Sequence, residues 1–594
     1  MKTQKREEIA DKYKWKLEHI FKDLNDWEEA VIESEKLVSK LDAKKDSIFD
    51  SASNLLMFLR LTDDFDLISG KVAAYAHLKG DENTKDSKRQ ELKQRLQPIG
   101  RSYSAIYSVF KTSLLKLEEE KLKSYYKEEK DLLFYKKFLD EVLRYKPHTL
   151  TPQEELIISQ TSRLNSAQRT YNAFSNADLV FPTVKDEKGN EIELTQSNYT
   201  KLMESKDRNV RENVFKEFYG VYKQYQNTVA ATFYASLEKD TFYSQVRKYN
   251  SSLEKSLFGD NIPLEVYNNL LKTVENNVPL MEKYLELRKK MLGVDELHMY
   301  DLYTPLVDLD MEIPYEKAFE TVKKALSVFG DKYISELEET YSGGWIDVYP
   351  NEGKKSGAYK SGTYGVRPYI LLNHKDNLNS MFTLCHELGH SQHSVYSQEN
   401  NPMLYAQYSI FTAEVASTVN EVLLMRYLLK NTNDKKMKQY LTTYFLEQFR
   451  STVFRQTMFA AFEQITHDKA EKGQPLTAEI LSGIYYDLNK KYYGEAVVHD
   501  EEIAIEWARI PHFYNAFYVY KYATGFSAAI SLAKQILEEG EPAVERYINF
   551  LKSGGSDYPI ELLKGAGVDM STTKPIEDAL EVFGELIEEL ESLI

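Results

Sequence analysis

Residues 383–393 have the sequence Thr-Leu-Cys-His-Glu-Leu-Gly-His-Ser-Gln-His, which contains His-Glu-x-x-His in a stretch whose pattern predicts a helix. His386 and His390 are four residues apart, so both imidazoles lie on one face of that helix and can bind one metal ion. Glu387 follows the first histidine and points beside the metal. Two helical histidines with a neighbouring carboxylate base are typical of zinc-dependent peptidases.

A catalytic zinc needs a third protein ligand and an open position for water. The segment at 412–424, Thr-Ala-Glu-Val-Ala-Ser-Thr-Val-Asn-Glu-Val-Leu-Leu, predicts a second amphipathic helix, with Thr412 as its N-cap. Glu414 lies in its first turn and is the expected third ligand. Glu421 comes seven residues later, about 20° further around the helix, so we expect it in the second shell, accepting the outer ring N–H of a ligand histidine.

Several segments resemble one known family, the oligoendopeptidase F branch of the thimet-oligopeptidase-like zinc metallopeptidases. They are GAY at 357–359, YGVRPYILLN at 364–373, HELGHSQH at 386–393, the helix with Glu414, WARIPHFYNAFYVYKYATGFSAA at 507–529, RYKPHTL at 144–150 and SNADLVFPTVKDEKGNEIEL at 175–194. The resemblance covers nearly the whole chain. It implies a mainly α, two-lobed helical zinc metallopeptidase with a deep central channel and one zinc ion per chain.

Composition excludes several classes of protein. The chain has 594 residues and a formal net charge of −16, which argues against binding nucleic acid or an anionic membrane surface. Its N-terminus is charged and no apolar segment follows it, so we expect neither a signal peptide nor a spanning helix. Cys385 is the only cysteine, and we expect it to be packed in a core rather than to bind metal. A cytoplasmic location follows as an expectation.

The pattern of the chain predicts two regions. Helical periodicity dominates up to about residue 175, and alternation at 179–184 and 191–194 predicts a β-hairpin. We therefore divide the chain into an N-terminal helical region at 1–195 and a catalytic region at 196–594. Short strands are also predicted at 345–349 and 369–373, which gives a small sheet just before the metal helix. Its edge strand could pair with an extended peptide, or the sheet could simply support the helix.

The C-terminal segment at 510–526 holds candidate catalytic side chains. Amide hydrolysis builds negative charge on the carbonyl oxygen, and His512 and a tyrosine can supply hydrogen-bond donors to that charge. The family resemblance implies that a histidine and tyrosines here contact substrate. His512 and Tyr514 match the family pattern as catalytic residues, whereas the further substrate-binding tyrosine could be Tyr518, Tyr520 or Tyr522. The alternative is that these tyrosines only pack in the core.

The remaining histidines carry weaker signals. His393 follows His390 by three residues, but a fourth protein ligand would close the position that water needs, so we expect His393 in the second shell or in a structural role. A structural role is expected for the others, which lack metal-ligand spacing: His19, His77, His148, His298, His374, His467 and His499.

These features predict a zinc endopeptidase that hydrolyses internal bonds of short unstructured oligopeptides. His386, His390 and Glu414 would bind zinc, and Glu387 would act as general base toward water activated at the metal. A helical zinc carboxypeptidase is the nearest alternative, and it would need a basic anchor such as Arg367 or Arg509. A noncatalytic peptide-binding protein with a structural zinc is the alternative from another class.

Overall fold

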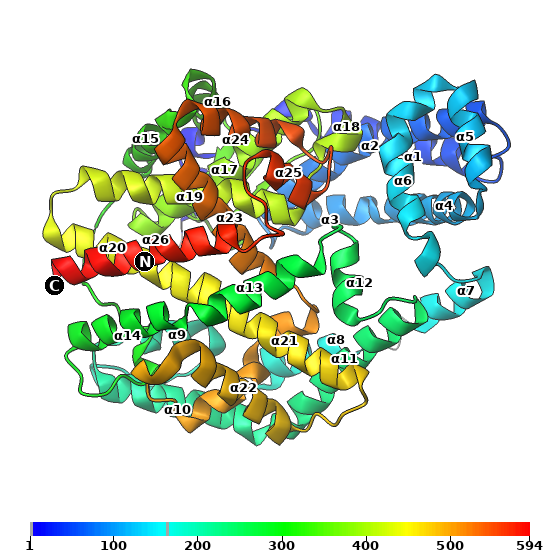
Figure 1. Ribbon diagram of the computed structural model, residues 1–594. Coiled ribbons are helices and arrows are strands. Elements are labelled where there is room, and N and C mark those ends of the chain that lie inside the picture. Colours follow the sequence, from blue (N-terminus) through cyan, green and yellow to red (C-terminus); the bar gives the residue numbers. More distant parts are fainter. Residues whose placement is uncertain (1–3, 162–165, 310) are drawn as a thin grey trace. The chain divides into compact units, whose positions relative to one another are not determined.

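Helices make up nearly all the regular structure, as the sequence predicts. The structure, a computed structural model, describes every residue except 1–3, 162–165 and 310 (Figure 1). The chain forms two compact units, each assembled from three stretches of sequence. Unit 1 comprises Met1–Thr149, Met311–Leu424 and Gly540–Asp557, and unit 2 comprises Leu150–Asp310, Met425–Glu539 and Tyr558–Ile594.

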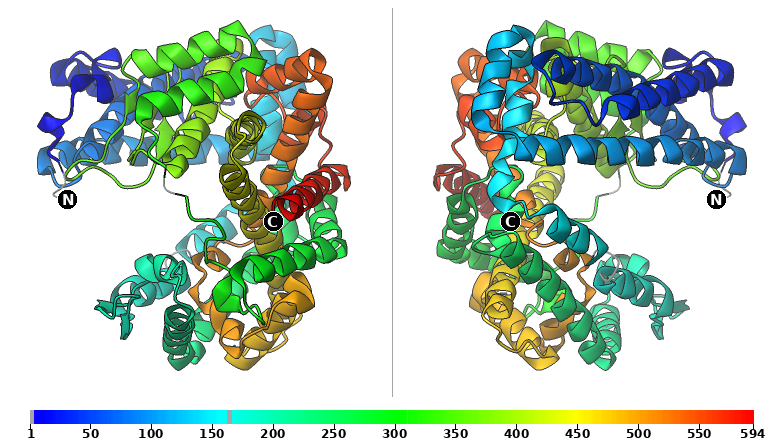
Figure 2. Two further views of the ribbon diagram at one scale, coloured as in Figure 1. Left: turned by 90° about the vertical axis from the view of Figure 1, so that its left-hand side faces the viewer. Right: turned by 90° about the vertical axis from the view of Figure 1, so that its right-hand side faces the viewer.

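Unit 1 contains the N-terminal helices and the predicted metal helices. Its helices are α1 (Leu24–Lys44), α2 (Ala52–Asp81), α3 (Ser87–Arg95), α4 (Gln97–Lys116), α5 (Glu119–Glu128), α6 (Lys136–Arg144), α15 (Tyr315–Ala325), α16 (Asp331–Ser342), α17 (Leu378–Asn400), α18 (Met403–Ala406), most of α19 (Ile410–Asn431) and α24 (Glu541–Ser553). The helix α1 packs along α2, and Figure 2 shows these N-terminal helices, in blue, running beside one another.

Unit 2 contains the C-terminal segment with His512. Its helices are α7 (Pro152–Thr161), α8 (Ala167–Ala173), α9 (Gln196–Met203), α10 (Arg208–Gln224), α11 (Gln226–Val246), α12 (Ser252–Phe258), α13 (Leu264–Asn276), α14 (Val278–Leu292), α20 (Lys435–Phe449), α21 (Arg455–Glu471), α22 (Ala478–Tyr493), α23 (Tyr520–Glu539), α25 (Pro559–Gly565) and α26 (Lys574–Leu593). The C-terminal helix α26 packs against α20 and α23 (Figure 1).

Two small sheets account for the strands of the described residues. The predicted hairpin is confirmed as β1 (Thr183–Lys185) paired antiparallel with β2 (Glu191–Glu193). The second sheet, in unit 1, has the order β3-β5-β4. Both predicted strands are present in it, as β3 (Ile346–Asp347) and β5 (Tyr369–Leu371). The third strand, β4 (Tyr359–Ser361), was not predicted, and it forms one edge.

The sheet of unit 1 shares a core with the N-terminal helices. Tyr369 and Leu371 of β5 are buried in the same apolar cluster as residues of α1, α2 and α4. The hydroxyl of Tyr359 in β4 donates to Oδ2 of Asp81 at the end of α2, at 2.8 Å. The small sheet before the metal helix is therefore fixed by the N-terminal helices, because apolar burial of β5 and the hydrogen bond from β4 to the buried carboxylate of Asp81 act together.

These units differ from the continuous division at residue 195 that the sequence suggests. The β1–β2 hairpin lies inside unit 2, and the helices before residue 149 belong to the same unit as α17. The reason is that long-range packing decides which segments form a unit, and such packing leaves no composition signal at a boundary. The division into 1–195 and 196–594 remains a prediction.

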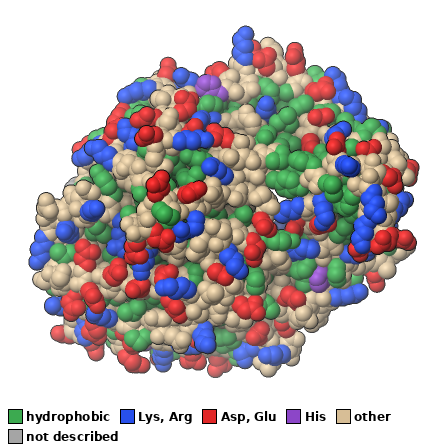
Figure 3. Space-filling model, turned by 45° about the horizontal axis from the view of Figure 1, so that its top comes forward, with side chains coloured by type: hydrophobic (Ala, Val, Ile, Leu, Met, Phe, Trp, Pro, Cys, Tyr) green, Lys and Arg blue, Asp and Glu red, His purple; other side chains and the backbone are tan. Residues whose placement is uncertain are grey.

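The surface agrees with the mixed charge of the sequence. On the face shown in Figure 3, acidic and basic side chains are interspersed, and Lys and Arg do not gather into one basic tract. Among the described helices, none combines the length and the apolarity needed to span a bilayer.

Candidate metal centre

The helix α17 presents the His-Glu-x-x-His motif. It begins after Asn377, whose side chain accepts a hydrogen bond from the Ser380 N–H at 2.9 Å and so caps the helix. His386 and His390 lie one turn apart, with ring centroids 4.7 Å apart. Glu387 lies between them in sequence and is 5% exposed. The motif is therefore held in regular helix, with Glu387 buried and both histidine rings partly buried.

Glu414 of α19 joins the two histidines. Its Oε2 lies 3.6 Å from Nε2 of His386, and its Oε1 lies 3.9 Å from Nε2 of His390. One ligand atom from each of these three residues falls within 4.8 Å of the other two. This spacing is what one ion bound to all three would require, since metal–ligand distances near 2 Å place the donors of one shell about that far apart. The structure thus brings together the three residues that the sequence singled out.

A close approach of two helices puts Glu414 in this position. A Cβ atom added to Gly389 of α17 would lie 2.6 Å from Cα of Ser417 and 3.0 Å from the Ala416 carbonyl oxygen, both in α19. Only a residue without a side chain leaves room for the α19 backbone here. Gly389 therefore sets the distance between α17 and α19, and sequence reasoning missed it although a glycine inside a helix often marks such an approach.

Glu421 contacts the far side of His386. Its Oε1 lies 2.6 Å from Nδ1 of His386, so the ring donates its Nδ1–H to the carboxylate and leaves Nε2 facing Glu414. A carboxylate on the outer nitrogen fixes the tautomer and the orientation of a ligand histidine. Glu421 is therefore placed to orient the His386 ring without being one of the three ligand candidates.

Burial and neighbouring charges shift the pKa values of His386, His390 and Glu387 in different directions. Burial alone would lower the pKa of His386, but the hydrogen bond and charge of Glu421, with Glu387 and Glu414 nearby, raise it to about 9. Burial, together with the positive charge of His386, lowers the pKa of His390, so this ring is neutral. Burial and the charge of Glu414 raise the pKa of Glu387 to about 7 against the opposing charge of His386. Oε2 of Glu387 has no hydrogen-bond partner among the described residues.

This donor set fits a zinc ion. Two imidazole nitrogens and one carboxylate oxygen are ligands that zinc accepts, and three protein ligands leave a fourth position for water. Cys385, the one thiol, is fully buried and does not belong to the cluster. The sequence-based expectation that it packs in the core agrees with this position.

His393 lies apart from the three ligand candidates. It is 1% exposed, and its ring stacks on Tyr408 with centroids 3.7 Å apart. The Tyr408 hydroxyl lies 2.6 Å from Oγ of Ser394 and 3.4 Å from Nζ of Lys360 in β4. His393 thus packs on Tyr408, on another part of α17 than the two ligand histidines face, and it does not belong to the cluster of His386, His390 and Glu414. The link from β4 through Lys360 to Tyr408 had no sequence signal, because it joins residues 48 apart.

The start of α19 differs from its prediction. The helix begins at Ile410, so Thr412 lies inside its first turn and its prediction as N-cap is wrong. Oγ of Ser409 accepts a hydrogen bond from the Thr412 N–H at 3.3 Å and fills that role. Two neighbouring residues with similar hydroxyls made the sequence signal ambiguous.

In unit 2, His512 forms an aromatic cluster with two of the three ambiguous tyrosines. Its ring stacks on Tyr518 with centroids 6.3 Å apart and meets Tyr522 edge-on at 6.1 Å. Tyr518 and Tyr522 also meet edge-on at 5.5 Å. His512 and Tyr522 are exposed and Tyr518 is half-buried, so the cluster presents polar groups at the surface of unit 2.

Tyr514 and Tyr520 lie away from this cluster. The Tyr514 hydroxyl lies 2.8 Å from Oγ1 of Thr232, and its ring stacks on Tyr171. Tyr520 is fully buried, with its ring 5.3 Å from that of Tyr267. The structure thus places Tyr518 and Tyr522, and not Tyr514 or Tyr520, in contact with His512.

The backbone that carries this cluster is held by a buried carboxylate. Phe517 has a φ of 54°, which is unfavourable for a residue with a side chain. Its N–H donates to Oε1 of Glu463 at 2.9 Å, and Glu463 is fully buried. Burial raises the pKa of Glu463 well above its usual range. This contact secures the turn between His512 and Tyr518, and no local sequence pattern predicts it.

The two arginines considered as anchors for a substrate carboxylate are already paired. Arg367 forms an ion pair with Glu336 and a 3.3 Å hydrogen bond to Thr340. Arg509 lies 3.4 Å from the buried carboxylate of Glu506. Neither guanidinium is available as the carboxypeptidase alternative would require.

Comparisons with known proteins agree with this centre. Residues 201–582 match peptidase family M3, and residues 113–181 match the description oligopeptidase F. The first match covers well over half of the chain and includes both helices of the candidate metal centre. The chain belongs to peptidase family M3. It is therefore a metallopeptidase with a catalytic metal and peptide substrates, as the motif predicted.

Full-length relatives and a solved structure agree with membership of family M3. Oligopeptidase PepF of Bacillus subtilis is 45% identical over 591 residues, which is 99% of this chain and 88% of the relative. Group B oligopeptidase PepB of Streptococcus agalactiae is 40% identical, covering 99% and 98%. The crystal structure of oligoendopeptidase-F from Enterococcus faecium has a TM-score of 0.73 at 37% identity, covering 96% and 99%. The expected family and the mainly α fold are confirmed.

Proposed function

We propose that this family M3 peptidase is a zinc-dependent endopeptidase that cleaves internal bonds of short unstructured peptides. The observation that carries the proposal is the cluster of His386, His390 and Glu414 beside a buried Glu387 that has one unpartnered oxygen. Zinc bound by these three residues would supply a Lewis acid that polarises the scissile carbonyl and lowers the pKa of water.

Glu387 is proposed as the general base. Its carboxylate accepts the proton of the attacking water and then delivers it to the leaving amine, as a base with a pKa near the working pH can do in both directions. Burial supports this role because it raises the pKa of Glu387 to about 7. Nδ1 of His386 keeps its proton and donates a hydrogen bond to Glu421, whose carboxylate holds the ring in one orientation during the reaction.

His512 is proposed as a hydrogen-bond donor to the oxygen that becomes negative during hydrolysis. Burial lowers the pKa of His512, so the ring is neutral and donates from one nitrogen. Tyr518 and Tyr522, which contact His512, are proposed as further donors or substrate contacts. These roles are supported by the ability of imidazole and phenol groups to donate hydrogen bonds and by the exposure of this cluster on unit 2.

The strand β4 is proposed to bind the substrate backbone. In the described part of unit 1, β4 pairs with β5 on one side only, so its other edge can add an extended peptide as a strand. Backbone pairing of this kind accepts many side chains. It also requires an unfolded segment, which a folded domain would provide only at a cost of roughly 5 to 15 kcal/mol.

Location and metal identity form part of the proposal. A zinc ion is favoured over other metals by the mixed nitrogen and oxygen donors. A reducing, cytoplasmic setting is supported by the single buried cysteine, Cys385.

Cleavage mapping tests the proposed function. The purified protein is incubated with a mixture of peptides and with a stable folded protein, with and without a chelator, and the products are identified by mass spectrometry. We expect internal cleavage of the peptides, an intact folded protein, and loss of activity with chelator that added zinc restores. Release of single C-terminal residues would favour the carboxypeptidase alternative, and loss of folding on metal removal would favour the scaffold.

A further inference from the structure

A short turn in unit 2, which we call the 513–517 turn, has an unusual backbone conformation. In the described part of the chain, the residues other than glycine with a positive φ angle are Lys248, Asn261, Asp376 and Phe517. Phe517 is the aromatic one, and its φ of 54° is unfavourable for a bulky side chain. Such a conformation persists only where the surrounding structure holds it, and strain of this kind gathers at functional sites.

Two contacts from helix α21 hold Phe517. Oε1 of Glu463 accepts the Phe517 N–H at 2.9 Å, and the ring of His467, one turn later on α21, lies 4.4 Å from the Phe517 ring. Glu463 and Phe517 are both buried, with exposed fractions of 0% and 1%. A buried N–H that loses its acceptor costs free energy, so the carboxyl group of Glu463 stabilises the turn in this conformation.

The same helix holds the residue next to His512. The ring of Phe513 packs on those of Phe459 and Phe462 on α21, with centroids 5.4 and 5.0 Å away. Phe462 directly precedes Glu463 in the sequence. Helix α21 therefore anchors the 513–517 turn at both of its ends, by ring contacts at the first residue and by a hydrogen bond at the last.

The exposed side chains of this region are attached to the two anchored ends. His512 precedes the turn and Tyr518 follows it, and their rings stack with centroids 6.3 Å apart. Tyr522, four residues later, meets both rings edge-on. We call these three residues the His512 cluster. A change of φ at Phe517 would move the tyrosines away from His512, because a backbone torsion redirects all of the chain that follows it.

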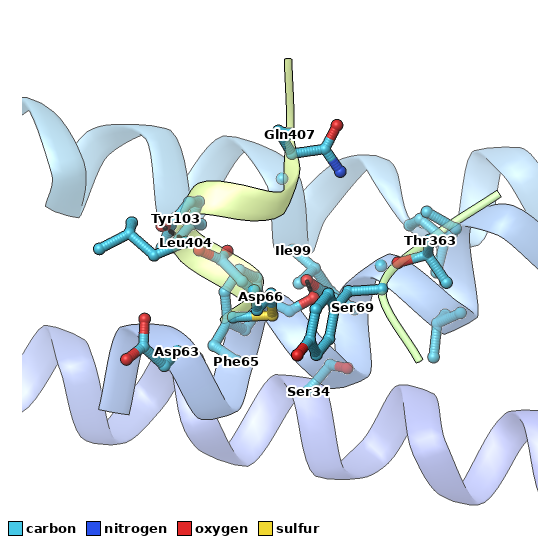
Figure 4. A pocket seen from close by; sticks show the side chains of 17 residues that line it. Ser34, Asp63, Phe65, Asp66, Ser69, Ile99, Tyr103, Thr363, Leu404 and Gln407 are labelled. Carbon is cyan, nitrogen blue, oxygen red and sulfur yellow. Dashed lines mark hydrogen bonds between the residues drawn. The ribbon is translucent and has the colours of Figure 1, made fainter. Parts of the chain in front are cut away.

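Glu463 accepts from the backbone, unlike the carboxylates that line a cavity of unit 1. In that cavity, of about 510 Å³, Asp63 and Asp66 project from α2 (Figure 4). Asp63 accepts a hydrogen bond from the Tyr135 hydroxyl, and Asp66 accepts one from the Tyr103 hydroxyl at 3.5 Å. Those contacts join side chains. The contact made by Glu463 instead fixes a peptide group, so it acts on the path of the chain.

Glu463 acts as an acceptor and not as a charge. Burial raises its pKa well above the usual range, and the charge of Asp240 adds to this rise while the Phe517 N–H opposes it, so the carboxyl group is neutral at physiological pH. Its Oε2 has no hydrogen-bond partner among the described residues. The contact with the turn therefore needs one oxygen, which a glutamine side chain would also supply.

We propose that Glu463 is a positioning residue for the peptidase reaction, because its hold on the Phe517 N–H fixes the geometry of the His512 cluster. Glu463 acts through the backbone and not on the substrate. This inference rests on the proposed function of His512 as a donor, and it adds the residue that keeps the donor in place. A misplacement of about 1 Å can cost roughly 10²-fold in rate, so Glu463 should affect kcat more than KM.

Conservative variants of the zinc-loaded full chain test this role. Glu463→Met keeps the size of the side chain and removes the acceptor. It should lower kcat on an internally quenched peptide by roughly tenfold to a hundredfold, with KM within about twofold of the parent value. Glu463→Gln keeps the acceptor and should stay within about twofold of the parent kcat. Zinc content should not change in either variant, since the ligand candidates lie in unit 1.

A matched control and a double variant separate positioning from lost stability. Glu282→Met removes the acceptor of another backbone N–H in unit 2, that of Glu495 at 2.9 Å, and should keep the parent kcat. In the His512→Phe background, Glu463→Met should cost less than about twofold in kcat, because the group it positions is already gone. Should Glu463→Met not fold, Glu463→Asp, which is one methylene shorter, takes its place with the same expectations.

The NMR signal of the His512 ring gives a readout without turnover. In protein labelled with carbon-13 at histidine, the signal missing from His512→Phe identifies that ring. It should move in Glu463→Met and stay in Glu463→Gln, because the tyrosine rings that contact His512 influence its resonance.

The outcomes decide between positioning and a structural role. Parent-like kcat in Glu463→Met, an equal loss in Glu463→Gln, or a full additive loss in the double variant overturns the proposal. If His512→Phe itself keeps the parent kcat, the proposed function of His512 fails, and the NMR signal decides on Glu463. A signal that moves in Glu463→Met alone then supports positioning, and a signal that stays overturns it.

Discussion

Nδ1 of His386 on α17 lies 2.6 Å from Oε1 of Glu421 on α19, while Nε2 of the same ring faces Glu414, which also lies on α19. One helix therefore supplies both a ligand candidate and the carboxylate that orients another ligand. The two glutamates are seven residues apart, which returns them to nearly the same face of α19. The metal centre thus depends on how α17 and α19 are positioned along each other, because both glutamates of α19 must meet His386 of α17.

Replacing Glu421 should weaken the metal site without removing a ligand. We expect Glu421→Gln to reduce zinc affinity by about 10- to 100-fold, because the outer nitrogen of His386 loses its charged partner. Glu399→Gln, at the exposed end of α17, serves as the matched control and should bind zinc as the parent does. Competition with a chromogenic chelator measures both. Parent-like affinity in Glu421→Gln would show that the contact has no influence on the metal.

Zinc binding should depend on pH through His386. In the metal-free protein the pKa of His386 is raised to about 9, so its ring is protonated at neutral pH. Zinc must displace that proton, and its affinity should therefore rise about tenfold per pH unit from pH 6 to 8 and level off near pH 9. Glu421→Gln should flatten this dependence, since the negative charge that holds the proton is lost. An affinity that is constant from pH 6 to 8 would contradict the assignment.

A methyl group at Gly389 should separate the two metal helices. Gly389→Ala places a Cβ atom 2.6 Å from Cα of Ser417, so we expect a loss of about 1 to 3 kcal/mol in unfolding free energy, together with weaker zinc binding. Gly483→Ala in α22 is the control, because a Cβ atom there meets nothing within 4 Å. That control should be stabilised by about 0.5 to 1 kcal/mol. Equal effects of the two substitutions in thermal or denaturant unfolding would refute a special role for Gly389.

Substitutions of His512 and Tyr514 in the C-terminal segment should have different effects on kcat. His512→Phe should lower kcat by roughly 10² or more with zinc content unchanged, the cost of losing one donor to a developing oxyanion. Tyr514→Phe removes only the contact with Thr232, so it should cost about 1 kcal/mol of stability and leave kcat near the parent value. An effect of His512→Phe confined to KM would instead make His512 a uniform binding contact.

Much of the metal centre is predictable from the sequence because its ligands follow helical spacing. His386 and His390 share a face by their separation of four residues, and Glu414 and Glu421 do so by their separation of seven. The hairpin and the strands around residues 346 and 370 are also predictable, because short alternating or apolar runs leave a local signal in the sequence.

The rest depends on contacts between segments far apart in the chain. Gly389 gives only a generic signal until α19 is placed against α17. β4 has no alternating pattern, and its position is fixed by Tyr359 reaching Asp81 on α2. The burial of Tyr514 against Thr232 likewise arises from tertiary packing, which a tyrosine-rich run does not reveal.

The substitution Glu387→Gln tests the central claim most directly. If Glu387 moves the proton of the attacking water and binds no metal, the variant should keep about one zinc ion per chain while turnover of an internally quenched peptide falls by roughly 10² to 10⁴-fold. Zinc content by atomic emission and kcat are measured on the same sample. Loss of zinc in the variant, or turnover close to that of the parent, would contradict the account.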